Sequence, residues 1–249
     1  MKNLMVYISP TGSFDNPQPD LKINDSKQLV KVQIENSLSL GWKLEDILLV
    51  TNFDFQYGPV KAIVLKDIQY FESYPKASKI NAIVKLFEKK LIQDNELYWF
   101  HDLDVFQLVQ ITESELKLGK ADLGLATYDA YNLRPSLVKI KKWNTGSIFF
   151  RQNARNIFYD IMHIMYDHEI REEKALTELT NKYRDIKKRV KKLNNTYNFV
   201  VYLTPDYNTV NKPIRVAHFH PQGDLPKDEQ NIPLIPDRLV RIFRYHRIS

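Results

Sequence analysis

The sequence LYWFHDLDV occupies residues 97–105 and joins an uninterrupted apolar run to two acidic residues. The run from Leu97 to Phe100 shows no alternation of polar and apolar residues, which is typical of a strand buried on both faces of a sheet. Residues two apart in an extended segment point to the same side, so we expect Asp102 and Asp104 to converge. They would do so at the carboxyl end of the strand, where open α/β sheets bind their ligands.

Outward from this segment, short strand-like runs alternate with amphipathic helical stretches, which predicts an α/β fold with a mostly parallel central sheet. The predicted strands are 4–8, 47–51, 60–65, 97–100, 123–126, 147–150, 200–203 and 216–219. The predicted helices are 26–40, 78–90, 153–168 and 169–180. We interpret 1–230 as one Rossmann-like domain and 231–249 as a basic and aromatic tail packed on it.

The amino-acid composition excludes several kinds of site. The chain of 249 residues has no cysteine, which excludes disulfides, thiolate metal sites and cysteine nucleophiles. It has seven glycines and no glycine-rich phosphate loop. No stretch approaches the length of a bilayer span and no signal peptide is evident, so we expect a soluble, cytoplasmic protein.

The acidic pair favours a divalent cation, because two convergent carboxylates repel unless a proton or a cation lies between them. Oxygen ligands suit Mg²⁺ or Mn²⁺, and imidazole suits Mn²⁺. His218 and His220 alternate on a predicted strand, and either one would complete the site. The alternatives are that Asp-x-Asp is a helix cap or surface turn and that the two histidines are structural.

The order of these motifs resembles that of glycosyltransferases of the GT-A fold, which use nucleotide-sugar donors. The motifs are an SK-x-x-A helix, YWFHDLDV, WNTGSIFFR, EEKALTEL, LTPDYN and HFH, spread over residues 4–227. The pattern is most similar to the glycogenin-like and lipopolysaccharide galactosyltransferase branches. It departs from them after HFH, where Pro221 and Gln222 precede Gly223 and no tryptophan follows Lys227.

The resemblance implies a metal site of Asp102, Asp104 and His218, with His220 as the fallback, holding Mn²⁺ or Mg²⁺. It also implies a set of donor-binding residues: Tyr7, Ser9, Thr11, Asn52, Lys79, Asp102, Asn144, Gly146 and Lys227. The pair Glu172-Glu173 resembles an acidic pair on the acceptor side. An inverting transfer needs a carboxylate base, for which Glu173 is the candidate and Asp129 the second choice. The implied partners are a nucleotide sugar, with UDP favoured, and an acceptor of unknown class.

Two basic segments suggest other partners. Residues 182–192 hold seven lysines and arginines and one aspartate, which is typical of a solvated helix face or of a nucleic-acid contact. Binding or modification of nucleic acid is therefore the alternative function. The tail from Arg238 interleaves arginines with aromatic residues, which suits packing on the domain or peripheral contact with an anionic membrane.

Overall fold

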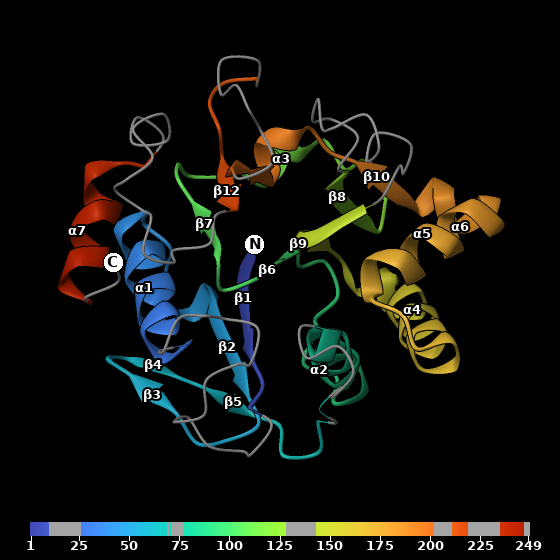
Figure 1. Ribbon diagram of the computed structural model, residues 1–249, viewed down its shortest axis with the longest axis horizontal. Coiled ribbons are helices and arrows are strands. Elements are labelled where there is room, and N and C mark those ends of the chain that lie inside the picture. Colours follow the sequence, from blue (N-terminus) through green and yellow to red (C-terminus); the bar gives the residue numbers. More distant parts are fainter. Residues whose placement is uncertain are drawn as a thin grey trace.

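A computed structural model describes residues 1–9, 26–68, 70, 77–127, 143–201, 211–218 and 235–246. Its centre is a seven-stranded sheet in the order β10-β8-β9-β6-β1-β2-β5 (Figure 1). The strands are β1 (Lys2–Tyr7), β2 (Ile47–Thr51), β5 (Ile63–Val64), β6 (Tyr98–His101), β8 (Leu123–Thr127), β9 (Trp143–Phe150) and β10 (Val190–Lys192). Only β9 runs antiparallel to its neighbours, β6 and β8. The prediction of a mostly parallel α/β sheet is confirmed.

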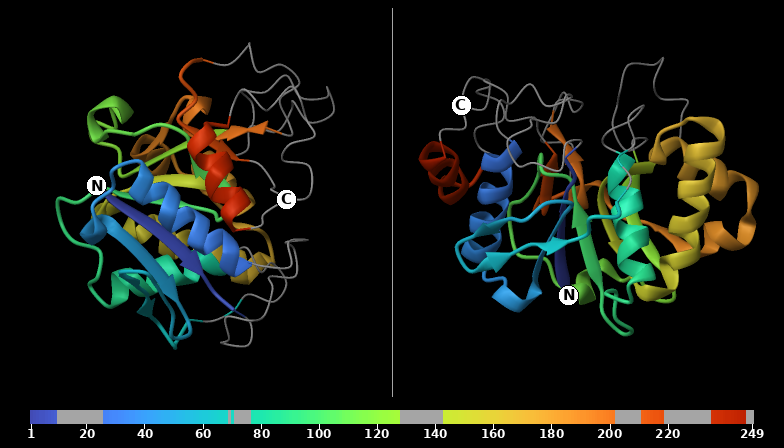
Figure 2. Two further views of the ribbon diagram at one scale, coloured as in Figure 1. Left: turned by 90° about the vertical axis from the view of Figure 1, so that its left-hand side faces the viewer. Right: turned by 90° about the horizontal axis from the view of Figure 1, so that it is seen from below.

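Helices cover both faces of this sheet. The longer ones are α1 (Ser26–Ser39), α2 (Ser78–Glu88), α4 (Arg155–His168), α5 (Glu172–Lys182) and α7 (Asp237–Tyr245), and the shorter ones are α3 (Glu113–Leu116) and α6 (Arg184–Arg189). Figures 1 and 2 show α1 and α7 on one side of the central strands and α2, α4 and α5 on the other. Among the described residues, none of the helices combines the length and the apolar character needed to cross a bilayer.

Strand β1 shows why the central strands are apolar throughout. Its alternate residues Leu4 and Val6 pack in the core beneath α2, α4 and α5. The intervening Met5 and Tyr7 pack in a second core with α1 and α7. Both faces of the strand are thus removed from water, and burial of each large apolar side chain contributes roughly 1.5–3 kcal/mol.

A smaller sheet lies beside the acidic segment. It contains β7 (Val105–Gln107), β11 (Phe199–Val200) and β12 (Val216–His218), in the order β11-β12-β7. Strand β12 runs antiparallel to β7 and places His218 opposite Val105. This pairing brings a histidine from near the end of the chain to the acidic pair.

Several local predictions differ from the structure. The helix expected over 169–180 begins only at Glu172, because Glu169 takes a left-handed conformation that ends α4. The strand expected at 60–65 is two short strands in different sheets, β4 (Val60–Lys61), which pairs with β3 (Gln56–Tyr57), and β5. The break falls at Ala62, whose amide donates a hydrogen bond to the carbonyl of Phe55 (2.9 Å). The basic segment 182–192 is not one helix face, because it continues from α6 into β10 at the sheet edge. Strand β7 and helix α3 were not predicted.

Helix α7 packs its apolar side chains against the domain. Leu239 and Phe243 are buried in the core shared with α1, and the Phe243 ring meets Phe106 edge-on at a centroid distance of 5.1 Å. Arg238 donates to the carbonyl of Leu108 (2.7 Å). The exposed residues of α7 are Asp237, Arg241, Arg244 and Tyr245. The predicted boundary between 230 and 231 lies outside the described residues.

Candidate active site

The acidic pair lies in a tight turn, not in an extended segment. Strand β6 ends at His101, and the amide of Val105 donates to the carbonyl of Asp102 (3.1 Å). The prediction of an extended Asp-x-Asp is therefore wrong, because the chain must turn here to leave the central sheet for β7. The pKa of Asp102 is raised by burial and, to a smaller extent, by the charge of Asp104, so the two carboxylates still interact.

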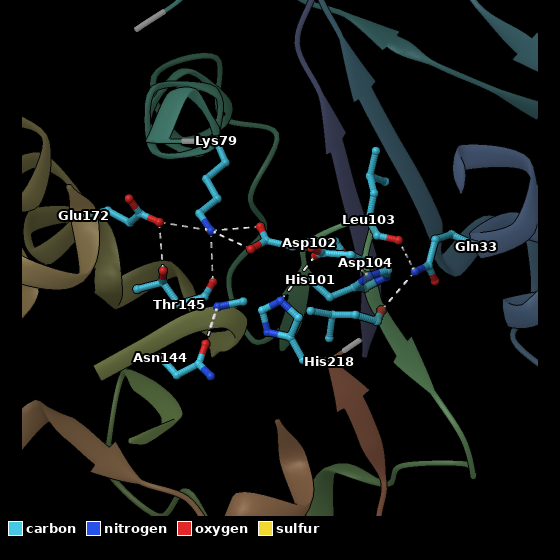
Figure 3. Close-up of polar contacts among 12 residues, drawn as sticks. Gln33, Lys79, His101, Asp102, Leu103, Asp104, Asn144, Thr145, Glu172 and His218 are labelled. Atoms are coloured by element: carbon cyan, nitrogen blue, oxygen red, sulfur yellow. Dashed lines mark hydrogen bonds and ion pairs between the residues drawn. The ribbon is translucent and has the colours of Figure 1, made fainter. Parts of the chain in front are cut away.

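Asp102 is held by an ammonium group at the start of α2. Lys79 Nζ donates to both oxygens of Asp102, at 2.8 and 3.0 Å. It also lies 3.2 Å from Oε1 of Glu172, at the first residue of α5 (Figure 3). Glu172 in turn accepts a hydrogen bond from the hydroxyl of Thr145 (2.9 Å). One lysine thus links two carboxylates from different elements of the fold.

Lys79 and Glu172 are nearly removed from water, whereas Asp102 stays partly exposed. Burial by itself lowers the pKa of the Lys79 ammonium, but the charges of Asp102 and Glu172 outweigh it, and the net pKa is raised. Burial likewise acts to raise the pKa of Glu172, yet Lys79 and Thr145 bring it below its ordinary value. For Asp102, burial and the charge of Asp104 prevail over Lys79, and the pKa is raised. Lys79 and Glu172 therefore form a charged pair at neutral pH.

Asp104 faces a different partner. Its Oδ1 lies 3.5 Å from Nε2 of His218, and both side chains are more than 90% buried. Burial acts to lower the pKa of the His218 imidazole, but the Asp104 carboxylate raises it above the ordinary value. Close behind the ring is Gly146, where a Cβ atom would lie 3.0 Å from His218 Nδ1. A side chain at 146 would therefore force the imidazole ring of His218 to shift by a few tenths of an ångström.

Strand β9 supplies the floor of the site. The carbonyl of Gly146 accepts the amide of Asp102 (2.9 Å), and the amide of Gly146 donates to Oδ1 of Asn144 (3.0 Å). Asn144 is fully buried, and its Nδ2 has no hydrogen-bond partner within the described part of the chain. A buried donor without a partner is costly, so this amide is suited to a polar group of a ligand.

The donor set can be tested against the metal that the resemblance implies. In the described ranges, no three histidine or acidic side chains already stand together as ligands. Asp104 and His218 are the close pair, while both oxygens of Asp102 bind Lys79. Two carboxylates and one imidazole around one turn nevertheless match the ligands that Mn²⁺ accepts, so the residues present fit such an ion.

The remaining predicted residues divide into two groups. The amide of Ser9 donates to Asn52 Oδ1 (2.9 Å) and Asn52 Nδ2 donates to the Ser9 carbonyl (2.6 Å), which ties together the ends of β1 and β2. Tyr7 is buried with its ring edge-on to Phe53 at 5.4 Å. The others lie outside the described residues: Thr11, Asp129, His220 and Lys227.

Of the two glutamates that open α5, the structure places Glu172 inside the cluster. Glu173 is half-buried, and its charge adds a smaller contribution than those of Asp102 and Glu172 to the raised pKa of Lys79. The sequence identified the pair but selected only Glu173. The helical spacing of buried Glu172, Ala175, Leu176 and Leu179 marks Glu172 as the inward residue.

Sequence reasoning also missed Gln33. This residue is buried on α1, and its Nε2 donates to the carbonyls of Leu103 and Val105, at 2.9 Å each (Figure 3). A signal was present, because Gln33 lies three and four residues after Val30 and Leu29 on the apolar face of the helix.

Comparisons with known proteins concern the whole fold. No protein-family model matches the chain, and no curated protein sequence matches it either. Among solved structures, the chain is similar to the galactosyltransferase LgtC in complex with donor and acceptor sugar analogs. The TM-score is 0.61 at 13% identity, over 98% of this chain and 96% of that one.

The chain has the GT-A fold. It is also similar to a glycosyltransferase involved in glycosylation of the major capsid of PBCV-1, with a TM-score of 0.55 at 13% identity over 88% of this chain and 93% of the other. A third similar structure is the glycosyltransferase GlyE of Streptococcus pneumoniae, with a TM-score of 0.57 at 11% identity over 99% of this chain and 64% of the other. The GT-A fold implied by the order of the sequence motifs is therefore confirmed.

Proposed function

We propose that this chain is a metal-dependent glycosyltransferase that moves a sugar from a nucleotide-sugar donor, with UDP favoured, to an acceptor hydroxyl. One observation carries the proposal: a buried acidic turn ends the central strand of a GT-A fold and lies beside a lysine and a histidine. The similarity to solved glycosyltransferases supports it.

In this proposal Asp104, His218 and Asp102 hold Mn²⁺ or Mg²⁺. The ion would supply positive charge to the leaving diphosphate, whose negative charge grows as the bond to the sugar breaks. His218 contributes its imidazole nitrogen as a neutral ligand. Lys79 and Glu172 keep Asp102 in one orientation, since each is fixed by at least one further contact.

The residues of β9 are proposed to contact the transferred sugar. The Nδ2 of Asn144 is a buried donor suited to a sugar hydroxyl, and Gly146 leaves room beside it. Glu173, at the start of α5, is proposed as the base that accepts the proton of the acceptor hydroxyl, with Asp129 as the second choice. The base and ribose of the donor are assigned to Tyr7, Ser9, Thr11 and Asn52, and its diphosphate to Lys227.

The experiment measures how nucleotide sugars change the thermal stability of the unaltered chain and of two aspartate variants. Thermal unfolding of the purified protein is measured with UDP-, GDP- and CMP-sugars, with and without Mn²⁺. We expect one donor to raise the midpoint only when Mn²⁺ is present, because a ligand that binds the folded state stabilises it. Asp104→Asn should abolish this shift and lower sugar transfer by about 100-fold or more, which corresponds to about 2.7 kcal/mol or more of lost charge stabilisation.

Asp122→Asn is the matched control. Asp122 is also nearly buried and pairs with Arg189 at 2.6 Å, at the far end of the sheet. Asp122→Asn should lower the stability of the fold, but the donor should still raise its thermal midpoint when Mn²⁺ is present. Normal transfer by Asp104→Asn, or an equal loss of transfer in both variants, would reject the metal-dependent mechanism.

A second candidate function is nucleic-acid binding along α6 and β10. The whole chain has 36 basic and 30 acidic side chains, and residues 182–192 have seven and one, so this segment accounts for the entire excess of positive charge. Its exposed basic residues are Lys182, Arg184, Lys187, Lys188 and Lys192. Binding to an oligonucleotide that falls steeply with salt, and that is lost when these residues are changed to glutamine, would support it. Salt-independent or absent binding would reject it.

A further inference from the structure

The acidic turn is held on its far side by helix α1. Gln33 Nε2 lies 2.9 Å from the carbonyl oxygen of Leu103 and 2.9 Å from that of Val105. These two residues flank Asp104 in the chain. Figure 3 shows Gln33 on the opposite side of the turn from Lys79. The turn is therefore held by one side chain from each of two helices.

The position of Gln33 is costly unless its hydrogen bonds are made. Its side chain is 1% exposed, on a helix face whose neighbours Leu29, Val30 and Ile34 are fully buried apolar residues. An unpaired carboxamide would be strongly unfavourable there. The amide nitrogen of glutamine carries two hydrogens, and the geometry gives one to each carbonyl.

Each of those bonds fixes a peptide group on one side of Asp104. Together they limit rotation of the backbone that carries the carboxylate toward His218, 3.5 Å away. Asp102 has its own support, because Lys79 binds its side chain and the Gly146 carbonyl accepts its amide. For Asp104, the backbone bonds from Gln33 take that supporting role.

We propose that Gln33 is a positioning residue for Asp104, and that it sets the affinity of the site for its divalent cation; this rests on the proposed function. Partners that orient the ligands of a metal typically change metal affinity by about 10–100-fold when they are removed. Gln33 touches neither the ion nor the sugar donor in this proposal. It acts through the peptide groups of the turn.

The experiment uses Gln33→Met, which keeps the length of the side chain and removes the donor. Asn36→Leu is the matched control: Asn36 is one turn further along α1, equally buried, and donates to the carbonyl of Gln107 (3.0 Å), away from the acidic turn. Mn²⁺ binding to the full chain is measured from the loss of the free-ion electron paramagnetic resonance signal. The His218 imidazole is followed by NMR, without metal, in the same variants.

We expect Gln33→Met to weaken Mn²⁺ binding by about 10–100-fold and to shift the His218 signals. Asn36→Leu should lower the denaturation midpoint by a similar amount, bind Mn²⁺ within about twofold of the unaltered chain and leave those signals in place. Gln33→Asn retains the carboxamide but withdraws it by one methylene. It should give an intermediate loss, and it keeps the test decisive if the methionine variant fails to fold.

Equal Mn²⁺ binding by Gln33→Met and the unaltered chain would overturn the proposal, as would an equal loss in Asn36→Leu. If the unaltered chain binds no Mn²⁺, the assignment of Mn²⁺ to this site is wrong and the claimed control of Mn²⁺ affinity is overturned with it. The NMR signals of His218 then show separately whether Gln33 positions the turn. The two failures are therefore distinguishable.

Discussion

The two aspartates of the acidic turn are two residues apart and have opposite surroundings. Asp102 binds Lys79, a cation that stays charged at ordinary pH and is itself paired with Glu172. Asp104 faces His218, whose imidazole can lose its proton and become a metal ligand. The two aspartates therefore differ in role. Asp102 belongs to a fixed network of charges with Lys79 and Glu172, whereas Asp104 lies beside an imidazole that can exchange its proton.

The largest expected effect comes from removing the fixed charge. In Lys79→Met, the carboxylates of Asp102 and Glu172 would face each other with no cation between them. Loss of one partner of a buried ion pair costs about 3–5 kcal/mol, and we expect a value near the lower end because Asp102 is partly exposed. Chemical denaturation of the purified variant measures this free energy of unfolding.

Lys85→Met is the control on the same helix. Lys85 pairs at the surface with Glu88 (2.7 Å), so its loss should cost less than about 1 kcal/mol. Lys79→Arg keeps the charge and should recover part of the stability. If Lys79→Met were as stable as Lys85→Met, the role of Asp102 in a fixed network of charges would be excluded.

The next effect concerns the Asp104 side. In Gly146→Ala the new methyl group would lie 3.0 Å from Nδ1 and 3.1 Å from Cε1 of His218, so the buried ring must move. We expect Mn²⁺-dependent donor affinity to fall by about tenfold, or about 1.4 kcal/mol, as is usual when a metal ligand loses its orientation. Isothermal titration with the donor, with and without Mn²⁺, measures this change.

Gly124→Ala on the neighbouring strand β8 separates packing from the site. Its methyl group would approach the end of the Leu118 side chain, so it should cost about 1–3 kcal/mol of stability through overpacking. Its donor affinity should not change. Equal donor affinities in the two alanine variants would show that the glycine at 146 has no part in orienting His218.

The sequence predicts those elements that are long enough to show a continuous or periodic pattern of apolar residues. The uninterrupted apolar run before the acidic pair predicts β6, and the helical spacing of apolar residues predicts α1 and α2. Strand β7 has only three residues, too few to show a period, so it was missed and with it the turn at Asp102. The order of the motifs predicts that His218 lies near the acidic pair. The pairing of β12 with β7, which places it there, is not evident from the sequence.

The candidate site was less predictable because its partners depend on tertiary packing. Glu172 and Glu173 are adjacent and chemically identical. The spacing of the apolar residues of α5 marks Glu172 as the inward one, but its contact with Lys79 depends on how α5 packs against the sheet. Gln33 is a polar residue on an apolar helix face, a pattern that indicates a buried partner but not its identity. In both cases local sequence gives the residue type, and the fold gives the contact.

The smallest expected effect is a pH dependence of stability that arises from Glu172, on the Asp102 side. The pKa of Glu172 is lower in the folded chain than its ordinary value of 4.5, because Lys79 and Thr145 favour the charged form against burial. A carboxylate of this kind stabilises the fold above its unfolded pKa, and that stabilisation is lost as the pH falls below about 4.5 toward the folded value. We therefore expect Glu172→Gln to be less stable than the unaltered chain at pH 7, with the difference shrinking as the pH falls below 4.5.

Glu178→Gln is the control for this prediction. Glu178 lies on the same helix with a side chain 39% exposed, and its variant should follow the stability of the unaltered chain throughout. Denaturation midpoints between pH 3 and 7 test this, and a constant offset for Glu172→Gln would mean that Glu172 does not titrate as part of the network of charges that holds Lys79.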